Sequence, residues 1–144
     1  MKRKYLVEGP IKPELISSYI SSLTGLLNTG GHSIFIGQVR ADQIEEKKVL
    51  AIEYTSYDDM VASEAERIIS ITKEAFSDVE SIEIIHSKGR VAAGEISLFV
   101  LVTAGHRDQA FRACRHVVEM LKISYPVWGK EILSDESHQW KENH

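Results

Sequence analysis

Cysteine is almost absent from this sequence, which has one, Cys114, among 144 residues. A single cysteine can neither close a disulfide within the chain nor build a cysteine-based metal cluster. Proteins of oxidising compartments commonly carry several cysteines in disulfides, so we expect a cytoplasmic protein. Cys114 falls on the apolar side of a predicted helix, and we therefore expect a core residue, not a nucleophile.

Long apolar runs are missing as well. No uninterrupted apolar stretch approaches the roughly 20 residues of a membrane-spanning helix, so we expect no membrane segment. The first ten residues, MKRKYLVEGP, are basic, but Glu8 and Pro10 follow only three apolar residues. This pattern does not predict a signal peptide.

Several familiar functional motifs are also absent. The sequence has no Gly-x-Ser-x-Gly elbow and no His-x-x-x-His pair, and its glycines match neither a P-loop nor a dinucleotide-binding fingerprint. We therefore expect neither a metal ion nor a bound cofactor. The net charge of −4 argues against a general nucleic-acid-binding protein.

What is present is the composition of an ordinary globular domain. Apolar residues make up 43% of the chain and charged residues 26%, and 144 residues suffice for one domain, residues 1–144, with a substantial core. Hydrophobic periodicity predicts helices from Pro13, over 60–76 and over 107–124. It predicts strands over 3–8, 33–39, 49–57, 81–86, 95–103 and 127–133. Several neighbouring strands are joined without a helix, which favours an α+β fold.

The connections are predicted from their composition. The polar segment 41–48 is expected to be a mobile loop, and Gly89 and Gly94 are expected to bracket a tight connection. In the strand over 49–57, alternation predicts that Leu50, Ile52 and Tyr54 share one face.

Cationic side chains gather near the ends of the predicted elements. Between His86 and Glu131, seven Lys or Arg residues face four acids, a local charge of +3 on a negatively charged chain. The cations at element ends are Arg40, His106, Arg107, Lys122 and Lys130. They are either solvated surface residues or parts of an anion site, since a helix N-terminus also presents free N–H groups. The stem of Lys122 borders the apolar stripe of its helix, which can partly desolvate and activate a lysine.

Five segments in this order resemble the catalytic (large) subunit of molybdopterin synthase, over nearly the whole chain. They are FIGQVR (35–40), LAIEYTSYDDM (50–60), IIHSKGRVAAGE (84–95), AGHRDQAFRACR (104–115) and LKISYPVWGKE (121–131). Each is modest alone, but together they are collinear and correctly spaced.

The resemblance implies an α/β hammerhead-type fold with a small additional β subdomain. It implies sulfur transfer to cyclic pyranopterin monophosphate, forming the dithiolene of molybdopterin in molybdenum cofactor biosynthesis. The sulfur would come from the C-terminal thiocarboxylate of a small ubiquitin-like partner subunit. The resemblance further implies a homodimer of this chain that forms a heterotetramer with two partner subunits.

The resemblance also implies the site residues. Lys122 matches the family's main catalytic lysine. Arg40 and Phe35 match residues of the family's substrate-binding strand. His106 and Arg107 match the family's His-Arg pair. The second catalytic lysine of the family directly follows a Trp. Here Trp128 is followed by Gly129, and the lysine comes one place later, at Lys130. One residue reverses the side-chain direction in a strand, so Lys130 needs a local bulge to reach the same site.

The length of the last helix adds a geometric expectation. Arg107 and Lys122 are fifteen residues apart, or about 22 Å at 1.5 Å per residue, about twice the length of a pterin phosphate. We therefore expect a composite site, with Lys122 and Lys130 from one subunit and His106 and Arg107 from its dimer mate. Arg40 can belong to either half.

Two other functions stay open from the sequence. One is a non-catalytic module that binds an anionic metabolite or the ubiquitin-like tail, which the Trp-Gly-Lys departure favours. The other is a phosphoester hydrolase that uses His106, which no carboxylate–histidine or metal-ligand pattern supports.

Overall fold

The computed structural model describes residues 4–141, which form an α+β fold. Its helices are α1 (Pro13–Ser21), α2 (Asp58–Ala75) and α3 (Arg107–Ser124), and a 3₁₀ turn (Ser22–Gly25) follows α1. Its strands are β1 (Leu6–Glu8), β2 (Gly31–Gln38), β3 (Gln43–Ile44), β4 (Lys47–Ser56), β5 (Val79–Ala92), β6 (Ile96–Ala104), β7 (Val127–Leu133) and β8 (His138–Trp140).

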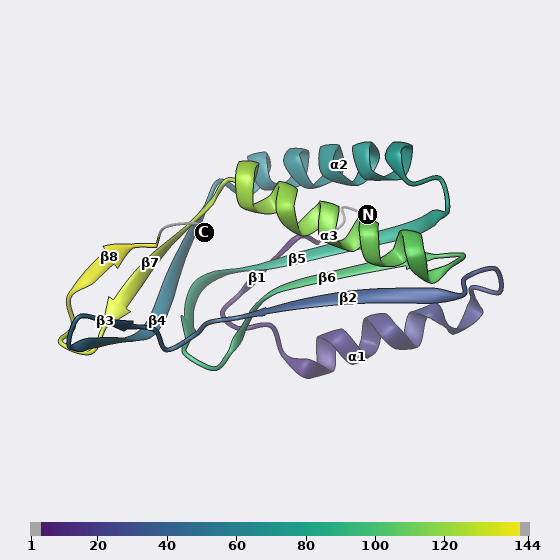
Figure 1. The fold of residues 1–144 in the computed structure, drawn as a ribbon. Coiled ribbons are helices and arrows are strands. Elements are labelled where there is room, and N and C mark those ends of the chain that lie inside the picture. Colours follow the sequence, from purple (N-terminus) through teal and green to yellow (C-terminus); the bar gives the residue numbers. More distant parts are fainter. Residues whose placement is uncertain (1–3, 142–144) are drawn as a thin grey trace.

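The eight strands form one continuous, mostly antiparallel sheet in the order β2-β6-β5-β4-β7-β8. At its margins β1 pairs with β5 in parallel, and β3 pairs with β4. Strands β2, β6, β5 and β1 lie among the helices, whereas β3, β4, β7 and β8 extend away from them at the left of Figure 1. The projecting part thus remains hydrogen-bonded to the main part of the sheet.

Strand β5 joins the two parts of the sheet. Its first half, 79–86, pairs with β6, and its second half, 89–92, pairs with β4. Gly89 lies where the partner changes and has a φ of +81°, which a side chain rarely tolerates. The expected tight connection between Gly89 and Gly94 is therefore wrong, because the strand continues through Gly89 and only the turn at Gly94 remains.

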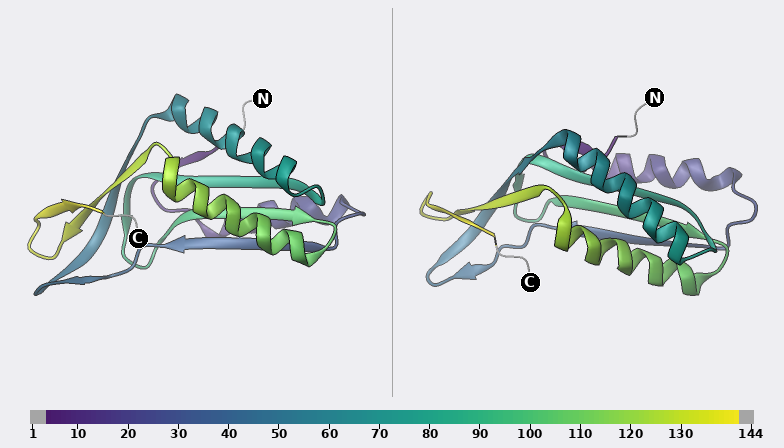
Figure 2. Two further views of the ribbon diagram at one scale, coloured as in Figure 1. Left: turned by 45° about the horizontal axis from the view of Figure 1, so that its top comes forward. Right: turned by 90° about the horizontal axis from the view of Figure 1, so that it is seen from above.

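The helices cover both faces of the main part of the sheet. Helices α2 and α3 lie on one face and α1 on the other (Figures 1 and 2). A cluster under α2 and α3 includes Val61, Ile68 and Val117 with sheet residues such as Val100. A second cluster under α1 includes Ile16 and Phe99, and a third fills the projecting part of the sheet.

Helix α3 has the predicted bounds. Six of its residues are buried at helical spacing: Ala110, Ala113, Cys114, Val117, Val118 and Leu121. The cap residue Tyr125 has extended backbone, and Pro126 follows it, so the helix ends where the residue before a proline disfavours helical geometry. The burial of Cys114 is confirmed, and burial raises the pKa of its thiol. This thiol is therefore a poor nucleophile.

Most other predicted elements are confirmed with small shifts of their ends. Helix α2 spans 58–75, and β7 has the predicted bounds of 127–133. The first strand was expected from residue 3, which lies outside the described residues, and β1 begins at Leu6. Strand β8 has no counterpart in the prediction, because three exposed residues carry no periodic signal.

Two expectations in the projecting part are wrong. The expected loop 41–48 forms a hairpin, in which Gln43 pairs with Lys48 and Glu45 takes the positive φ of the turn. Leu50 does not share a buried face with Ile52, because the pairing of β4 with β7 is irregular between Val49 and Ala51. Leu50 is consequently 45% exposed.

No helix among residues 4–141 is long and apolar enough to cross a membrane.

Phe99 offers a test of this packing. Its side chain is fully buried under α1, 5.7 Å from the ring of Tyr19. We expect Phe99→Ala to lower the free energy of unfolding by about 3–5 kcal/mol, because it leaves a cavity in the core. Leu27→Ala, at a 91% exposed position, should change it by less than about 0.5 kcal/mol. Urea denaturation followed by circular dichroism measures both, and equal losses would contradict the described packing.

Candidate functional site

A cavity of about 460 Å³ lies where the C-terminal end of α3 meets the junction between the two parts of the sheet. Its lining comes from the end of β2, the middle of β4, the β5–β6 pair, the end of α3 and the β7–β8 hairpin. The lining includes Phe35, Arg40, Asp42, Tyr54, His86, Ser97, Lys122, Tyr125, Trp128, Gly129, Trp140 and Lys141.

Three of the residues predicted for the site meet at this cavity. Phe35 on β2, Arg40 beyond the end of β2 and Lys122 in the last turn of α3 all line it. The guanidinium of Arg40 donates to the carboxylate of Asp42, yet its side chain is 85% exposed. Because a guanidinium has five N–H donors, it can hold this carboxylate and also bind an anion.

Tyr54 and His86 are lining residues that the sequence patterns did not identify as functional. The Tyr54 hydroxyl donates to Ser97 Oγ at 3.1 Å, and burial raises the pKa of Tyr54. The His86 ring stands edge-on to the Tyr54 ring, with centroids 4.9 Å apart. Both therefore present rigid aromatic surface to the cavity.

The hydrogen bonding of His86 defines its tautomer. Nδ1 lies 2.7 Å from the carbonyl oxygen of Ser87, and a carbonyl can only accept, so Nδ1 carries the proton. Burial lowers the pKa of His86, which keeps the ring neutral near pH 7. Nε2 is then a hydrogen-bond acceptor.

Tyr125 brings a further polar group to the cavity. Its hydroxyl is buried and has no hydrogen-bond partner within residues 4–141. Burial raises the pKa of Tyr125 above its ordinary value, so the hydroxyl stays protonated. A buried hydroxyl without a partner is costly, and a polar ligand in the cavity would relieve this cost.

The structure does not bring Lys130 to the cavity. The pairing of β4 with β7 is regular from Ser56–Val127 to Ile52–Glu131, so the bulge that Lys130 would need is not there. Lys130 lies opposite Glu53, whereas its neighbour Gly129 lies opposite Tyr54, a lining residue. Since successive side chains point to opposite faces, Lys130 is directed to the face that Glu53 occupies, away from Tyr54.

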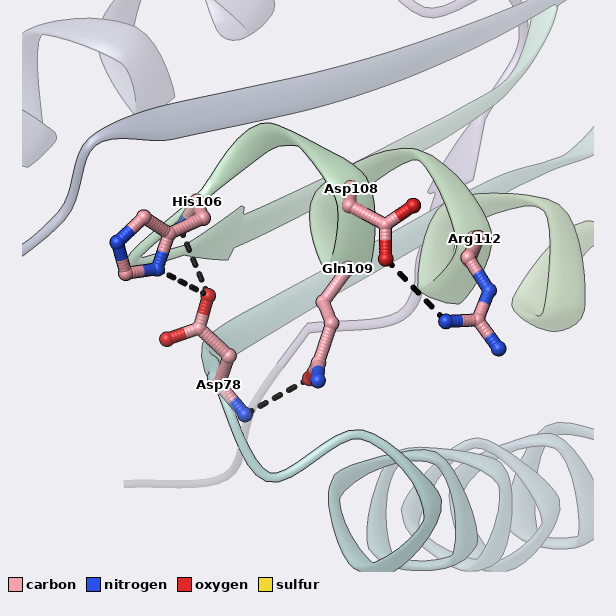
Figure 3. A network of polar contacts seen from close by, with 5 residues as sticks. All are labelled: Asp78, His106, Asp108, Gln109 and Arg112. Atoms are coloured by element: carbon pink, nitrogen blue, oxygen red, sulfur yellow. Dashed lines mark hydrogen bonds and ion pairs between the residues drawn. The ribbon is translucent and has the colours of Figure 1, made fainter.

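His106 and Arg107 lie at the other end of α3 and do not line this cavity. His106 is the N-cap, and its backbone N–H donates to Asp78 Oδ2 at 2.7 Å (Figure 3). Its Nδ1 lies 3.2 Å from the same oxygen, and Gln109 Oε1 accepts from the backbone N–H of Asp78. The anion at this helix end is therefore the chain's own carboxylate, which the sequence could not reveal because Asp78 is 28 residues away.

The two side chains at this turn nevertheless face solvent. The imidazole of His106 is 87% exposed, and Arg107 is also exposed. Asp78 fixes the backbone of the turn, so both side chains are held in place on the surface.

This arrangement suits an anionic, partly aromatic molecule. Arg40, Lys122 and Lys141 provide positive charge in the lining, and Phe35 and Tyr54 provide flat apolar surface. No cluster of three or more His, Cys, Asp or Glu side chains that could hold a metal ion occurs within residues 4–141. Binding and proton transfer by Lys122 or Nε2 of His86 are the chemical steps that these side chains can support.

Comparisons with known proteins agree with the resemblance of the five segments. The family model described as "MoaE protein" matches residues 7–124. The molybdopterin synthase catalytic subunit of Taeniopygia guttata is 32% identical over 143 residues, covering 99% of this chain and 85% of that protein. That of Drosophila willistoni is 37% identical over 136 residues, but this chain spans only 36% of its length. Other Drosophila relatives are similarly longer, so the chain covers about a third of them.

Solved structures show the same fold. The crystal structure of molybdopterin synthase from Staphylococcus aureus matches with a TM-score of 0.85 and 27% identity, over 99% of this chain and 98% of that one. A complex of subunits 1 and 2 of the molybdopterin-converting factor from Helicobacter pylori matches with a TM-score of 0.80 and 18% identity, over 97% and 90% of the two chains. The chain belongs to the MoaE family of molybdopterin synthase catalytic subunits.

The role of Asp78 at the His106 turn can be tested by mutation. Asp78→Ala removes the acceptor for the His106 N–H, and we expect it to lower the free energy of unfolding by about 1–2 kcal/mol, as for other lost helix caps. Asp108→Ala removes an exposed carboxylate from the same helix end, together with its pair with Arg112. This control substitution should lower the free energy of unfolding by only about 0.5 kcal/mol. Equal losses in urea denaturation would show that Asp78 acts through charge alone and not as a cap.

Proposed function

We propose that this chain transfers sulfur to cyclic pyranopterin monophosphate and so forms the dithiolene of molybdopterin. The observation that carries the proposal is the meeting of Phe35, Arg40 and Lys122 at one cavity in a chain of this family. The family resemblance alone does not say that these three residues, from β2 and the far end of α3, meet in space.

The chemistry of the lining supports this substrate class. The cyclic phosphate of the pterin is an anion that Arg40 can bind, and the ring system can lie against aromatic side chains such as Phe35. The incoming thiocarboxylate is also anionic, and the ammonium of Lys122 can bind it. Each transfer breaks the C–S bond of the thiocarboxylate and forms a C–S bond on the pterin in place of a C–O bond, whose oxygen leaves, and water supplies the oxygen of the partner's new carboxylate. This chemistry requires no cofactor.

A solved complex of this fold suggests the partner. The Helicobacter pylori structure is a complex of two subunits of the molybdopterin-converting factor. By analogy, we propose a small ubiquitin-like sulfur-carrier subunit with a thiocarboxylated C-terminus for this chain. Its tail would enter the cavity and present its sulfur near Lys122.

A homodimer of this chain is part of the same proposal, with one partner subunit at each end of the resulting heterotetramer. Strand β2 is an edge strand of the sheet, and Ile34, Phe35 and Ile36 on it are between 37% and 45% exposed. Exposed apolar residues on an unpaired edge are typical of a surface that another chain covers.

The dimer also gives His106 and Arg107 a function. They lie at the opposite end of α3 from Lys122, so we propose that they serve the cavity of the neighbouring subunit. Lys122, Arg40 and Phe35 would come from one chain and His106 with Arg107 from the other. Lys130 is outside this set, because the register of β7 directs it away from Tyr54.

The finer description of the fold and the cellular location are also proposals. We propose that residues 1–144 form a single domain of the α/β hammerhead type and that β3, β4, β7 and β8 are its small additional β subdomain. We further propose that the protein is cytoplasmic, since its one cysteine, Cys114, is free and buried.

A non-catalytic module that binds an anionic metabolite or the ubiquitin-like tail is the second candidate. Its supporting observation is that Gly129 follows Trp128, where the family has a lysine, while Lys130 does not line the cavity.

The direct assay combines the protein with thiocarboxylated partner and cyclic pyranopterin monophosphate and follows dithiolene formation. We expect product with the wild type and a loss of about 100-fold or more in kcat for Lys122→Ala, in the range typical of lost acid–base or electrostatic groups. Lys73→Ala, at an exposed position on α2, is the control for loss of a lysine. Tight binding without product would favour the second candidate, and product formation without the partner would contradict the first.

The composite site is tested by mixing two inactive variants. Lys122→Ala and Arg107→Ala dimers are combined and allowed to exchange subunits before the assay. In a composite site, half of the sites in a mixed dimer contain both intact residues, so activity should partly return. Activity that stays at the level of the separate variants would place all of these residues within one subunit's site.

A further inference from the structure

The pairing of the last two strands places Lys141 next to the cavity. Trp140 of β8 lies opposite Lys130 of β7, so in this antiparallel pair Lys141 lies opposite Gly129. A hydrogen bond of 2.9 Å from the backbone N–H of Lys141 to the carbonyl oxygen of Gly129 holds this register. Both residues line the cavity.

The register also determines on which face of the sheet the Lys141 side chain lies. Gly129 lies opposite Tyr54 on its other side, so Tyr54, Gly129 and Lys141 form one row across three strands. Residues directly opposite each other on neighbouring strands have their side chains on the same face. The Lys141 side chain therefore starts from the face on which Tyr54 lines the cavity, whereas Lys130 and Glu53 belong to the opposite row.

Gly129 allows Ile52 and Tyr54 to pack closely against β7. A Cβ at this position would meet Ile52 Cγ2 at 2.9 Å and Tyr54 Cε1 at 3.3 Å, so even a small side chain would require its neighbours to move. A lysine cannot stand at position 129 without that rearrangement. Gly129 therefore contributes no side chain to the row that it shares with Tyr54 and Lys141.

We propose that Lys141 is an anion-binding residue of this cavity, the second ammonium group beside Lys122. The cavity lining then has three positively charged side chains, Arg40, Lys122 and Lys141. Its one negatively charged side chain, Asp42, already binds Arg40. This excess of positive charge suits a reaction whose two reactants are both anions. The inference rests on the proposed function for the identity of those anions, which are the pterin phosphate and the partner's C-terminal thiocarboxylate.

The experiment compares Lys141→Ala with Lys141→Arg, Lys130→Ala and Lys73→Ala in the complete assay. Lys141→Ala should lower kcat/KM by about tenfold or more, as expected for a lost hydrogen bond to a charged group. Lys141→Arg should recover most of the rate because it keeps the charge. Lys130→Ala should cost less than Lys141→Ala, although the two lysines lie on neighbouring strands, and Lys73→Ala should match the wild type.

Two further readouts separate anion binding from a structural effect and identify the anion. A lost contact to an anion should make kcat/KM fall less steeply with salt concentration, since one fewer charge is screened. A raised KM for cyclic pyranopterin monophosphate would assign Lys141 to the phosphate. Weaker binding of the partner, measured by calorimetry with and without its C-terminal glycine, would assign Lys141 to the tail.

The inference and the proposed function fail in different ways. If the wild type makes no product, the proposed function fails. If the wild type is active but Lys141→Ala matches Lys73→Ala in rate and in salt dependence, Lys141 does not bind an anion. A larger loss for Lys130→Ala than for Lys141→Ala would also overturn the inference, because it would contradict the register that carries it.

Discussion

The burial of one face of helix α3 is the constraint on which the site depends. Six residues of this helix are buried against the sheet and α2, so α3 is held as a straight element of eighteen residues, or about 27 Å. Its two ends therefore cannot approach each other. Lys122 is fixed at the end that faces the cavity, and His106 is fixed at the other end by Asp78. The proposed division of the site between two subunits rests on the packing of this helix.

The cavity itself depends on the continuity of the sheet. Strand β4 pairs with β5 on one side and β7 on the other, and this places Tyr54 between Gly89 and Gly129. The two glycines act differently. Gly89 allows β5 to pass from one part of the sheet to the other, and Gly129 allows Ile52 and Tyr54 to pack closely against β7. The strands that build the projecting part of the sheet thus also shape the space in which the reactants would meet.

The sequence predicted those features that depend on periodicity. The bounds of α3 and β7, the core position of Cys114 and the separation of Arg107 from Lys122 all follow from residue spacing along one element. Features that depend on register between strands were missed. A sequence pattern shows a lysine after Trp128-Gly129, but the side chain of Lys130 is directed by its pairing with Glu53, a residue 77 positions earlier. The irregularity near Leu50 and the pairing of β8 with β7 have the same origin.

Long-range polar contacts were equally out of reach of sequence patterns. The carboxylate of Asp78 reaches the His106 turn from 28 residues away, and this contact becomes visible only in three dimensions. A crystal structure of the dimer with phosphate bound tests the proposed composite site. We expect an anion near Arg40 and Lys122 of one chain, with His106 and Arg107 of the other chain facing the same cavity. A dimer in which His106 and Arg107 face solvent, far from any neighbouring cavity, would contradict it.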